Sequence, residues 1–326
     1  MRILVTGAAG MIGQKLVARL AAEGHVGGRP IAALLLHDVV APAAPPGLAA
    51  ESVTGDLAGP GAAAELAAFR PDLVFHLAGV VSGEAEADFE LGYRVNLHGT
   101  LALFEALRQA GSHPRLVYAS SIAVFGAPFP EVIPDDFHPV PLTSYGTQKL
   151  MGELLLNDYT RRGFLDGIGL RLPTICVRPG RPNKAASGFF SSIIREPLAG
   201  REAVLPVPRE VVHTHASPRA AVGFLLHAAT LDAAAIGARR NLTMPGVAVS
   251  VAEEIAALGR VAGEAPLALI RDAPDPAVWA IVRNWPTRFA ATRARDLGFA
   301  AETSFEEIIR IHIADELGGV VPRPAS

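Results

Sequence analysis

Short apolar runs alternate with helical patterns along the first half of the chain. The apolar runs predict strands at residues 3–6, 31–36, 51–53, 73–77, 115–120 and 168–172. Between them, apolar positions recur at helical spacing in residues 12–23, 62–69, 89–110 and 145–162. The strands lack alternating polar positions, which is typical of a parallel sheet covered on both faces. The pattern therefore predicts a Rossmann-type α/β fold, a doubly wound parallel sheet with helices on both faces.

The pattern becomes less regular after Pro173. We expect a loop at residues 179–182, a helix at 187–198, a proline-interrupted stretch at 201–208 and a helix at 218–230. The last of these helices is expected to return to the main sheet. The prediction is a main α/β domain of residues 1–172 with a return segment at about 212–238. Residues 173–211 and 239–326 are expected to form a smaller C-terminal substrate lobe.

The composition excludes several classes of protein. The chain has 326 residues, of which 50% are hydrophobic and 19% charged, so it holds enough apolar material for a full core. A formal net charge of −3 provides no field to attract nucleic acid or an anionic membrane, and no apolar run approaches the roughly 18 residues of a membrane span. A single cysteine, Cys176, excludes an internal disulfide framework. Because the first strand leaves no room for a signal peptide, we expect a cytoplasmic protein.

Three glycines with the spacing G-x-x-G-x-x-G follow the first predicted strand and open the first predicted helix. Gly7 permits a tight turn, Gly10 lets the backbone approach a pyrophosphate, and Gly13 allows close contact between helix and strand. The helix N-terminus offers unpaired N–H groups to the phosphates. Glycine-rich turns are common, so the support comes from the strand before and the helix after. The pattern predicts a dinucleotide site in the main domain.

An acidic residue at the end of the second strand indicates which dinucleotide is bound. The Asp38 carboxylate can accept hydrogen bonds from the adenosine ribose and repels a 2′-phosphate, which favours NAD over NADP. The alternative is an aspartate that only caps a loop. Asp56 and Leu57, after the third strand, are expected near the adenine. Residues 77–79 supply small side chains where the cofactor lies close to the backbone.

Tyr145 and Lys149 form a Y-x-x-x-K pattern at the start of a predicted helix, so both side chains lie on one face. A free tyrosine has a pKa of about 10 and is a poor base at neutral pH. The lysine ammonium and the positive nicotinamide ring of an oxidised cofactor favour the phenolate and are expected to lower that pKa. The pair therefore predicts a general base suited to neutral pH, although the spacing alone also occurs in ordinary amphipathic helices.

Ser120 and Ser121 end the fifth predicted strand, at the carboxyl edge where such sheets bind their ligands. The Ser121 hydroxyl is expected to hold the substrate oxygen while Tyr145 exchanges its proton. A serine pair at the end of a strand is more often a turn device, so the interpretation depends on the glycine motif and on the Tyr145–Lys149 pair.

Taken together, these segments resemble the extended short-chain dehydrogenase/reductase family, which contains sugar-nucleotide epimerases and dehydratases. The matching segments, in family order, are residues 5–13, 76–78, 95–96, 120–126 and 144–149, with residues 293–299 resembling the C-terminal lobe. The resemblance implies a catalytic triad of Ser121, Tyr145 and Lys149. It also implies a bound nicotinamide dinucleotide, expected to be NAD. The residues expected to bind it are Gly7, Gly10, Met11, Ile12, Gly13, Asp38, Asp56, Leu57, Leu77, Ala78, Gly79, Asn96, Ser120, Tyr145, Lys149, Pro173, Thr174 and Ile175.

Two later segments depart from the sugar-nucleotide members. Residues 178–190 and 213–219 resemble a branch that oxidises the C2 hydroxyl of a four-carbon aldonate with NAD. A carboxylate substrate needs at least one cation, and these segments contain several. The expected substrate contacts are Ser121, Tyr145, Arg178, Arg181, Asn183, Lys184, Ser187, His215 and Arg219. No third ligand accompanies His213 and His215, so no metal site is predicted.

Two other functions use the same features. A sugar-nucleotide epimerase or dehydratase has the same triad and needs a diphosphate site, for which Arg181, Lys184 and Arg209 are candidates. A non-catalytic NAD sensor on this fold typically lacks the tyrosine–lysine pair that this chain retains. The expected partner is a small sugar acid. By analogy with the family we also expect a homodimer formed through residues 89–110 and the helix of Tyr145.

Overall fold

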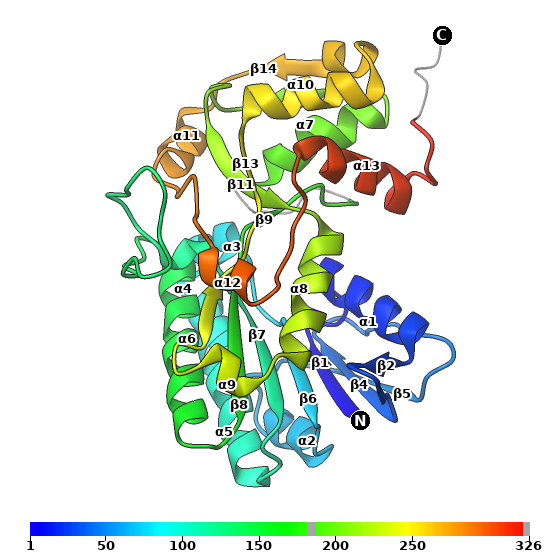
Figure 1. Ribbon diagram of the computed structural model, residues 1–326, viewed down its shortest axis with the longest axis vertical. Coiled ribbons are helices and arrows are strands. Elements are labelled where there is room, and N and C mark those ends of the chain that lie inside the picture. Colours follow the sequence, from blue (N-terminus) through cyan, green and yellow to red (C-terminus); the bar gives the residue numbers. More distant parts are fainter. Residues whose placement is uncertain (181–186, 322–326) are drawn as a thin grey trace.

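The computed structural model describes residues 1–180 and 187–321, and its largest element is a parallel seven-stranded sheet. The strand order is β12-β8-β7-β6-β1-β4-β5, which confirms the predicted doubly wound Rossmann-type fold (Figure 1). The strands are β1 (Arg2–Thr6), β4 (Ala33–Asp38), β5 (Ala50–Thr54), β6 (Leu73–His76), β7 (Arg115–Ser121), β8 (Asp166–Leu172) and β12 (Asn241–Thr243).

The strand order reverses between β1 and β6. From β1 the chain continues through β4 to β5, whereas β6, β7 and β8 extend the sheet in the other direction. Thr6 pairs with His37 on one side and with His76 on the other, so these strands end level at one edge. Loops that leave the sheet here diverge, and such a switch point opens a crevice at the carboxyl edge.

Helices bury one apolar stripe each against the two faces of this sheet. On one face lie α1 (Met11–Glu23) and α8 (Pro218–Thr230), through side chains such as Leu16 and Leu225. On the other lie α2 (Ala62–Ala68), α5 (Thr100–Ala110) and α6 (Ser144–Arg161), through Leu66, Leu103 and Leu156. The central strands β1, β4 and β6 are mostly apolar and almost entirely buried, as a sheet covered on both faces requires.

A smaller lobe lies above the carboxyl edge of the sheet (Figure 1). Its three-stranded sheet has the order β13-β11-β9, and a second pair joins β10 to β14. The strands are β9 (Thr174–Ile175), β10 (Ala203–Leu205), β11 (Val212–Ala216), β13 (Val247–Ser250) and β14 (Ile270–Asp272). Its helices are α7 (Gly188–Leu198), α10 (Val251–Ala262), α11 (Pro276–Val282) and α13 (Phe305–Glu316). Phe190, Leu258 and Ile309 are among the side chains of its separate core.

The structure divides the chain differently from the prediction at two places. Strand β12 was assigned to the lobe, but it pairs in parallel with β8 and extends the main sheet. Strand β11 was assigned to the return segment, but it pairs with β9 and β13 in the lobe. Three residues are too few for a periodic signal, so the sequence did not reveal the pairing of β12.

The long helix expected at residues 89–110 is also subdivided. It consists of α4 (Phe89–Gly92), a π-helical segment (Tyr93–Gly99) and α5, and it is preceded by α3 (Ser82–Ala87). A short antiparallel ribbon of β2 (His25–Val26) and β3 (Arg29–Pro30) separates α1 from β4. The remaining helices, α9 (Ala233–Ile236) and α12 (Thr292–Asp296), are single turns. Within residues 1–180 and 187–321, every helix is too short or too polar to cross a bilayer.

Candidate active site

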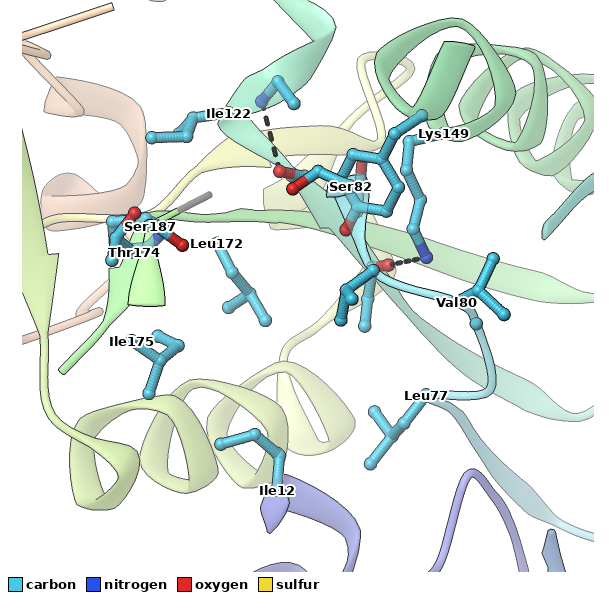
Figure 2. A pocket seen from close by; sticks show the side chains of 18 of the residues that line it. Ile12, Leu77, Val80, Ser82, Ile122, Lys149, Leu172, Thr174, Ile175 and Ser187 are labelled. Carbon is cyan, nitrogen blue, oxygen red and sulfur yellow. Dashed lines mark hydrogen bonds between the residues drawn. The ribbon is translucent and has the colours of Figure 1, made fainter. Parts of the chain in front are cut away.

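A cavity of about 360 Å³ lies at the carboxyl edge of the sheet, between the main domain and the lobe. Loops that follow β1, β6, β7 and β8 form most of its wall, together with the start of α6 (Figure 2). The lobe contributes residues after β9 and from β11. This is the switch point described above, where the fold leaves space for a ligand.

The glycine loop after β1 has the close contacts that its spacing predicts. Gly7 has a φ of +74°, and a Cβ there would come within 2.6 Å of the Ala78 backbone nitrogen. At Gly13 a Cβ would lie 2.2 Å from the Gly7 carbonyl oxygen. Gly10 is the N-cap of α1 and provides no side-chain hydrogen bond to that helix. The first turn of α1 therefore presents free N–H groups to the cavity, which suits a pyrophosphate.

Asp38 is bound to this glycine loop. Its carboxylate accepts hydrogen bonds from the backbone N–H groups of Ala9 at 2.9 Å and Val39 at 2.7 Å. The aspartate is not among the residues that line the cavity, so its observed contacts are those of a loop-capping residue. Each carboxylate oxygen can accept further hydrogen bonds, and the side chain is only partly buried. The position of Asp38 therefore allows it to cap the loop and to accept hydrogen bonds from a ribose.

Asn96 does not line the cavity, although it was expected to bind the cofactor. It lies in the π-helical segment, where its side chain accepts from the Val80 N–H at 2.9 Å and donates to Gln148 at 2.8 Å. A Cβ on Gly79 would lie 2.9 Å from the Asn96 Oδ1 and 3.3 Å from the Lys149 Nζ. Asn96 thus fixes the loop that follows β6 without lining the cavity itself.

Tyr145 and Ser121 both line the cavity, and a hydrogen bond joins their side chains. Thr143 caps α6 by accepting from the Gly146 N–H at 3.0 Å, which fixes the turn that carries Tyr145. Burial raises the pKa of Tyr145, whereas a hydrogen bond from Ser121 lowers it, and burial is the larger effect. The protein's own groups therefore do not produce the lowering of this pKa, which the prediction assigns to Lys149 and the nicotinamide ring together. Desolvation of the phenol dominates this pKa, and no contribution of Lys149 offsets it.

Lys149 is buried beside Tyr145, with its Nζ 5.8 Å from the centre of the tyrosine ring. The ammonium donates a hydrogen bond to the Ala119 carbonyl oxygen at 2.9 Å (Figure 2). Burial lowers the pKa of Lys149 to about 8, and the charge of Glu153 opposes that shift. The amine is therefore close to its titration point near neutral pH.

A buried group of charged residues supports this end of the site. The Glu153 carboxylate accepts from the Ser120 hydroxyl at 2.5 Å and from the Arg171 guanidinium at 2.7 Å. Glu153 and Arg171 are both buried, so each satisfies the other's charge. Ser120 lines the cavity, as predicted for a cofactor residue, but its hydroxyl proton is directed to Glu153.

The far end of the cavity has a different chemistry. Arg178, Ser187, Thr174 and His213 line it, together with Trp285 and Pro286. In Figure 2, Thr174 and Ser187 lie across the cavity from Lys149. Among the described lining residues Lys149 and Arg178 are cationic, and none is aspartate or glutamate. This distribution of charge favours an anionic ligand.

Two of the predicted substrate residues lie elsewhere. His215 is completely buried in the core of the lobe, between Phe190 and Phe305, with its Nε2 2.9 Å from Glu254. Alternate residues of a strand share a face, but the lobe core covers His215 while His213 reaches the cavity. Arg219 forms an ion pair with Asp315 on the surface and does not line the cavity. Arg181, Asn183 and Lys184 lie outside the described residues.

Three predicted cofactor residues are also absent from the lining. Asp56 forms an ion pair with Arg94, Leu57 is buried in the core beneath α2 and α5, and Ala78 packs against that core. The other predicted cofactor residues, apart from Asp38 and Asn96, line the cavity: Gly7, Gly10, Met11, Ile12, Gly13, Leu77, Gly79, Ser120, Tyr145, Lys149, Pro173, Thr174 and Ile175.

Several lining residues were not predicted. His213, Trp285 and Pro286 come from the lobe, whereas Ser82 is the first residue of α3 and Thr143 is the N-cap of α6. Trp285 is one of only two tryptophans in the chain, a weak signal that carries no information about position. The other four have no sequence pattern of their own, because their place in the cavity depends on contacts distant along the chain.

Comparison with known proteins agrees with this geometry. Residues 3–219 match the NAD dependent epimerase/dehydratase family. A D-erythronate dehydrogenase from Cupriavidus necator is 47% identical over 319 residues, which cover 97% of this chain and 98% of the relative. Another from Haemophilus influenzae is 41% identical over 311 residues, 95% of this chain and 98% of the relative.

A solved structure gives a close match to the whole fold. It is described as the nucleoside-diphosphate-sugar epimerase from Agrobacterium tumefaciens and is 58% identical, with a TM-score of 0.96. The match covers 99% of this chain and 96% of that chain. The predicted family and the predicted cofactor, NAD, are thereby confirmed: the chain belongs to the NAD dependent epimerase/dehydratase family.

Proposed function

We propose that this NAD-dependent oxidoreductase oxidises the C2 hydroxyl of a small aldonate, with D-erythronate and 2-dehydro-D-erythronate as its substrate and product. The observation that carries the proposal is the lining of the cavity. Its described residues include Ser121, Tyr145 and Lys149 from the main domain and Arg178 from the lobe, with no acidic side chain among them. The names of the two relatives that match nearly the whole chain support the same substrate.

In this proposal Tyr145 takes the proton of the C2 hydroxyl. Before the transfer, Ser121 orients that hydroxyl and donates to the phenolate that then accepts the proton. Its hydrogen bond already shifts the pKa of Tyr145 in the direction that favours the phenolate. The Lys149 ammonium stabilises the phenolate and binds the nicotinamide ribose. When bound, NAD supplies the acceptor for the hydride that leaves C2. The residues of the chain contribute orientation and charge.

Arg178 is our candidate for binding the carboxylate. Its backbone is held on both sides, because its N–H donates to Ser191 at 2.9 Å and its carbonyl accepts from Arg195 at 2.8 Å. No acidic side chain pairs with Arg178 among residues 1–180 and 187–321. Burial and the neighbouring Arg195 lower the pKa of its guanidinium, so a bound carboxylate would relieve an unfavourable charge. A guanidinium binds such a group with two parallel hydrogen bonds.

The preference for NAD over NADP depends on Asp38 in this proposal. The carboxylate lies at the end of β4 and fixes the glycine loop through Ala9. A 2′-phosphate near this negative charge would be repelled, whereas ribose hydroxyls can donate to it. The Gly7, Gly10 and Gly13 cradle would hold the pyrophosphate.

A nucleotide-sugar epimerase is the second candidate, favoured by the description of the 58% identical structure. Such an enzyme needs cations for a diphosphate. Of the three candidates, Arg209 forms a two-bond ion pair with Asp272, at 3.0 and 2.7 Å, outside the cavity lining. The other two, Arg181 and Lys184, lie outside the described residues.

A panel of four- to six-carbon aldonates with NAD or NADP tests the proposal. NADH formation, followed by absorbance at 340 nm, is expected with D-erythronate and NAD, and its rate is expected to fall by about 10² or more in Tyr145→Phe. A nucleotide sugar that is isomerised without net NADH, together with inactivity on every aldonate, would favour the epimerase instead.

We also propose that the protein is a homodimer. Large apolar side chains are exposed on α4, α5 and α6, where Phe89 is 59% and Leu154 is 60% exposed, and Leu101 and Met151 lie on the same helices. Joining two copies would bury these side chains. Light scattering is expected to give twice the mass of the chain for the wild-type protein and the mass of one chain for Leu154→Glu.

The cytoplasmic location of the protein stays a prediction.

A further inference from the structure

Thr174 and His213 form a polar contact at the end of the cavity away from Lys149. Thr174 lies in β9 and His213 in β11, two strands that pair in parallel. The Thr174 Oγ1 and the His213 Nε2 are 2.8 Å apart, and both residues line the cavity. Figure 2 shows Thr174 beside this end of the cavity, across from the labelled Lys149. The catalytic triad makes no use of this contact.

The direction of the hydrogen bond follows from the other side of the imidazole. The backbone carbonyl of Pro286 also acts on the ring of His213 and raises its pKa, and a carbonyl can favour the ring in this way only through an N–H. Burial lowers the pKa of His213 to about 3, so the ring is neutral and has a single N–H. That proton belongs to Nδ1, which leaves Nε2 as an acceptor. The Thr174 hydroxyl therefore donates to His213.

The imidazole has little freedom to rotate away. Its ring stacks on Phe190 with the centroids 5.3 Å apart and the planes 3° from parallel. On its other side Trp285 lies 5.4 Å away. Only 3% of His213 is exposed, so water does not compete for Nε2. The hydroxyl proton of Thr174 is thus permanently engaged.

We propose that Thr174 is a specificity residue that accepts a hydrogen bond from a substrate hydroxyl other than the reacting one, with His213 as the residue that positions it. This inference rests on the proposed oxidation of a polyhydroxy acid. A hydroxyl whose proton is engaged presents only lone pairs to the cavity. It therefore pairs with a donor such as an alcohol and repels a carboxylate or phosphate oxygen.

Arg178 and Thr174 then divide the recognition of the substrate. The guanidinium only donates hydrogen bonds and suits the carboxylate, whereas the Thr174 oxygen only accepts them and suits a distal hydroxyl. A substrate that lacks that hydroxyl would leave the lone pairs of this oxygen without a donor. Such an unmatched polar group produces strong discrimination against the deoxy compound.

Two analogues of D-erythronate test the proposal. 2,4-Dihydroxybutanoate lacks the C3 hydroxyl and 2,3-dihydroxybutanoate lacks the C4 hydroxyl, while both keep the carboxylate and the reacting C2 hydroxyl. The quantity to measure is the ratio of kcat/KM for D-erythronate to that for each analogue. Thr174→Val removes the acceptor at nearly constant volume, Thr174→Ser retains it, and His213→Phe keeps the stacked ring but removes Nε2.

In Thr174→Val, the ratio for one of the two analogues is expected to fall by about tenfold or more. Thr174→Ser is expected to keep the wild-type ratio, and His213→Phe to lower it in the same direction as the valine variant. Wild-type ratios for both analogues in Thr174→Val would overturn this inference while leaving the proposed oxidation intact. A wild-type enzyme that forms no NADH with any aldonate would instead contradict the proposed function.

Discussion

Lys149 and Glu153 lie one turn apart on α6, and the carboxylate of Glu153 counteracts the effect of burial on the Lys149 ammonium. Burial lowers the pKa of Lys149 to about 8, and the negative charge of Glu153 keeps it from falling further. Glu153 itself is fixed by Ser120 and Arg171. The lysine that is expected to stabilise the phenolate thus depends on a carboxylate that does not line the cavity.

Replacing Glu153 with glutamine is expected to shift the high-pH limb of the kcat profile to lower pH. Loss of the negative charge removes the effect that raises the pKa of Lys149, so the amine becomes neutral at a lower pH. Activity that requires the ammonium is then lost at a lower pH than in the wild type. The measurement is NADH formation with saturating substrate from pH 6 to pH 10.

A matched control is Glu105→Gln. Glu105 is ion-paired with Arg108 on the surface of α5 and makes no contact with Lys149, so the same change of charge is expected to leave the limb in place. A limb at the wild-type pH in Glu153→Gln would contradict the role assigned to this carboxylate.

Tyr145→Phe is expected to reduce kcat by about 10² or more, because the general base is lost. The glycine cradle of Gly7, Gly10 and Gly13 is unchanged in this variant, so the dissociation constant for NAD is expected to stay close to its wild-type value. Stopped-flow or steady-state kinetics give the first quantity and calorimetric titration the second. Near-normal turnover would remove Tyr145 from the mechanism.

Asp38→Ala is expected to narrow the preference for NAD over NADP. The variant removes the negative charge that opposes a 2′-phosphate, and it also releases the Ala9 N–H from its hydrogen bond. Affinity for NAD is therefore expected to weaken while affinity for NADP improves relative to it. Titrating wild type and variant with both cofactors gives the ratio directly, and an unchanged ratio would show that Asp38 only fixes the loop.

Stability is expected to decrease as the pH falls from 7 to 5. Burial lowers the pKa of His76, His213 and His215 to about 3, whereas an unfolded histidine titrates near 6.5. The unfolded chain therefore binds more protons in this range. Each of these histidines is expected to lower the free energy of unfolding by about 1–2 kcal/mol between pH 7 and pH 5. Glu254 opposes the trend, since burial raises its pKa and the folded chain keeps that proton.

The variant that isolates this effect is His215→Phe, which places an aromatic ring among Phe190 and Phe305. The free energy of unfolding, measured by denaturant titration at pH 7 and pH 5, is expected to change less than in the wild type. Replacing the exposed His138 with glutamine is the control and is expected to retain the wild-type dependence. If the free energy of unfolding of His215→Phe changes with pH as much as that of the wild type, buried His215 does not contribute to the loss of stability at low pH.

Features encoded by local spacing were predictable from the sequence. The glycine motif and the Tyr145–Lys149 pair each lie within one element, so their geometry follows once the element forms. Features that depend on distant contacts were not. His213 and His215 lie two residues apart in β11 and are both buried, yet only His213 lines the cavity. The direction of the pKa shift of Tyr145 could not be predicted for a related reason, because the desolvation of its phenol depends on the whole cavity wall.

D-Erythronate deuterated at C2 tests the central claim most directly. Incubated with NAD and the enzyme, it is expected to give deuterated NADH in equal amount to the keto acid, and more slowly than the unlabelled substrate. Unlabelled NADH, or deuterium retained in an isomerised product without net NADH, would contradict the proposed oxidation at C2.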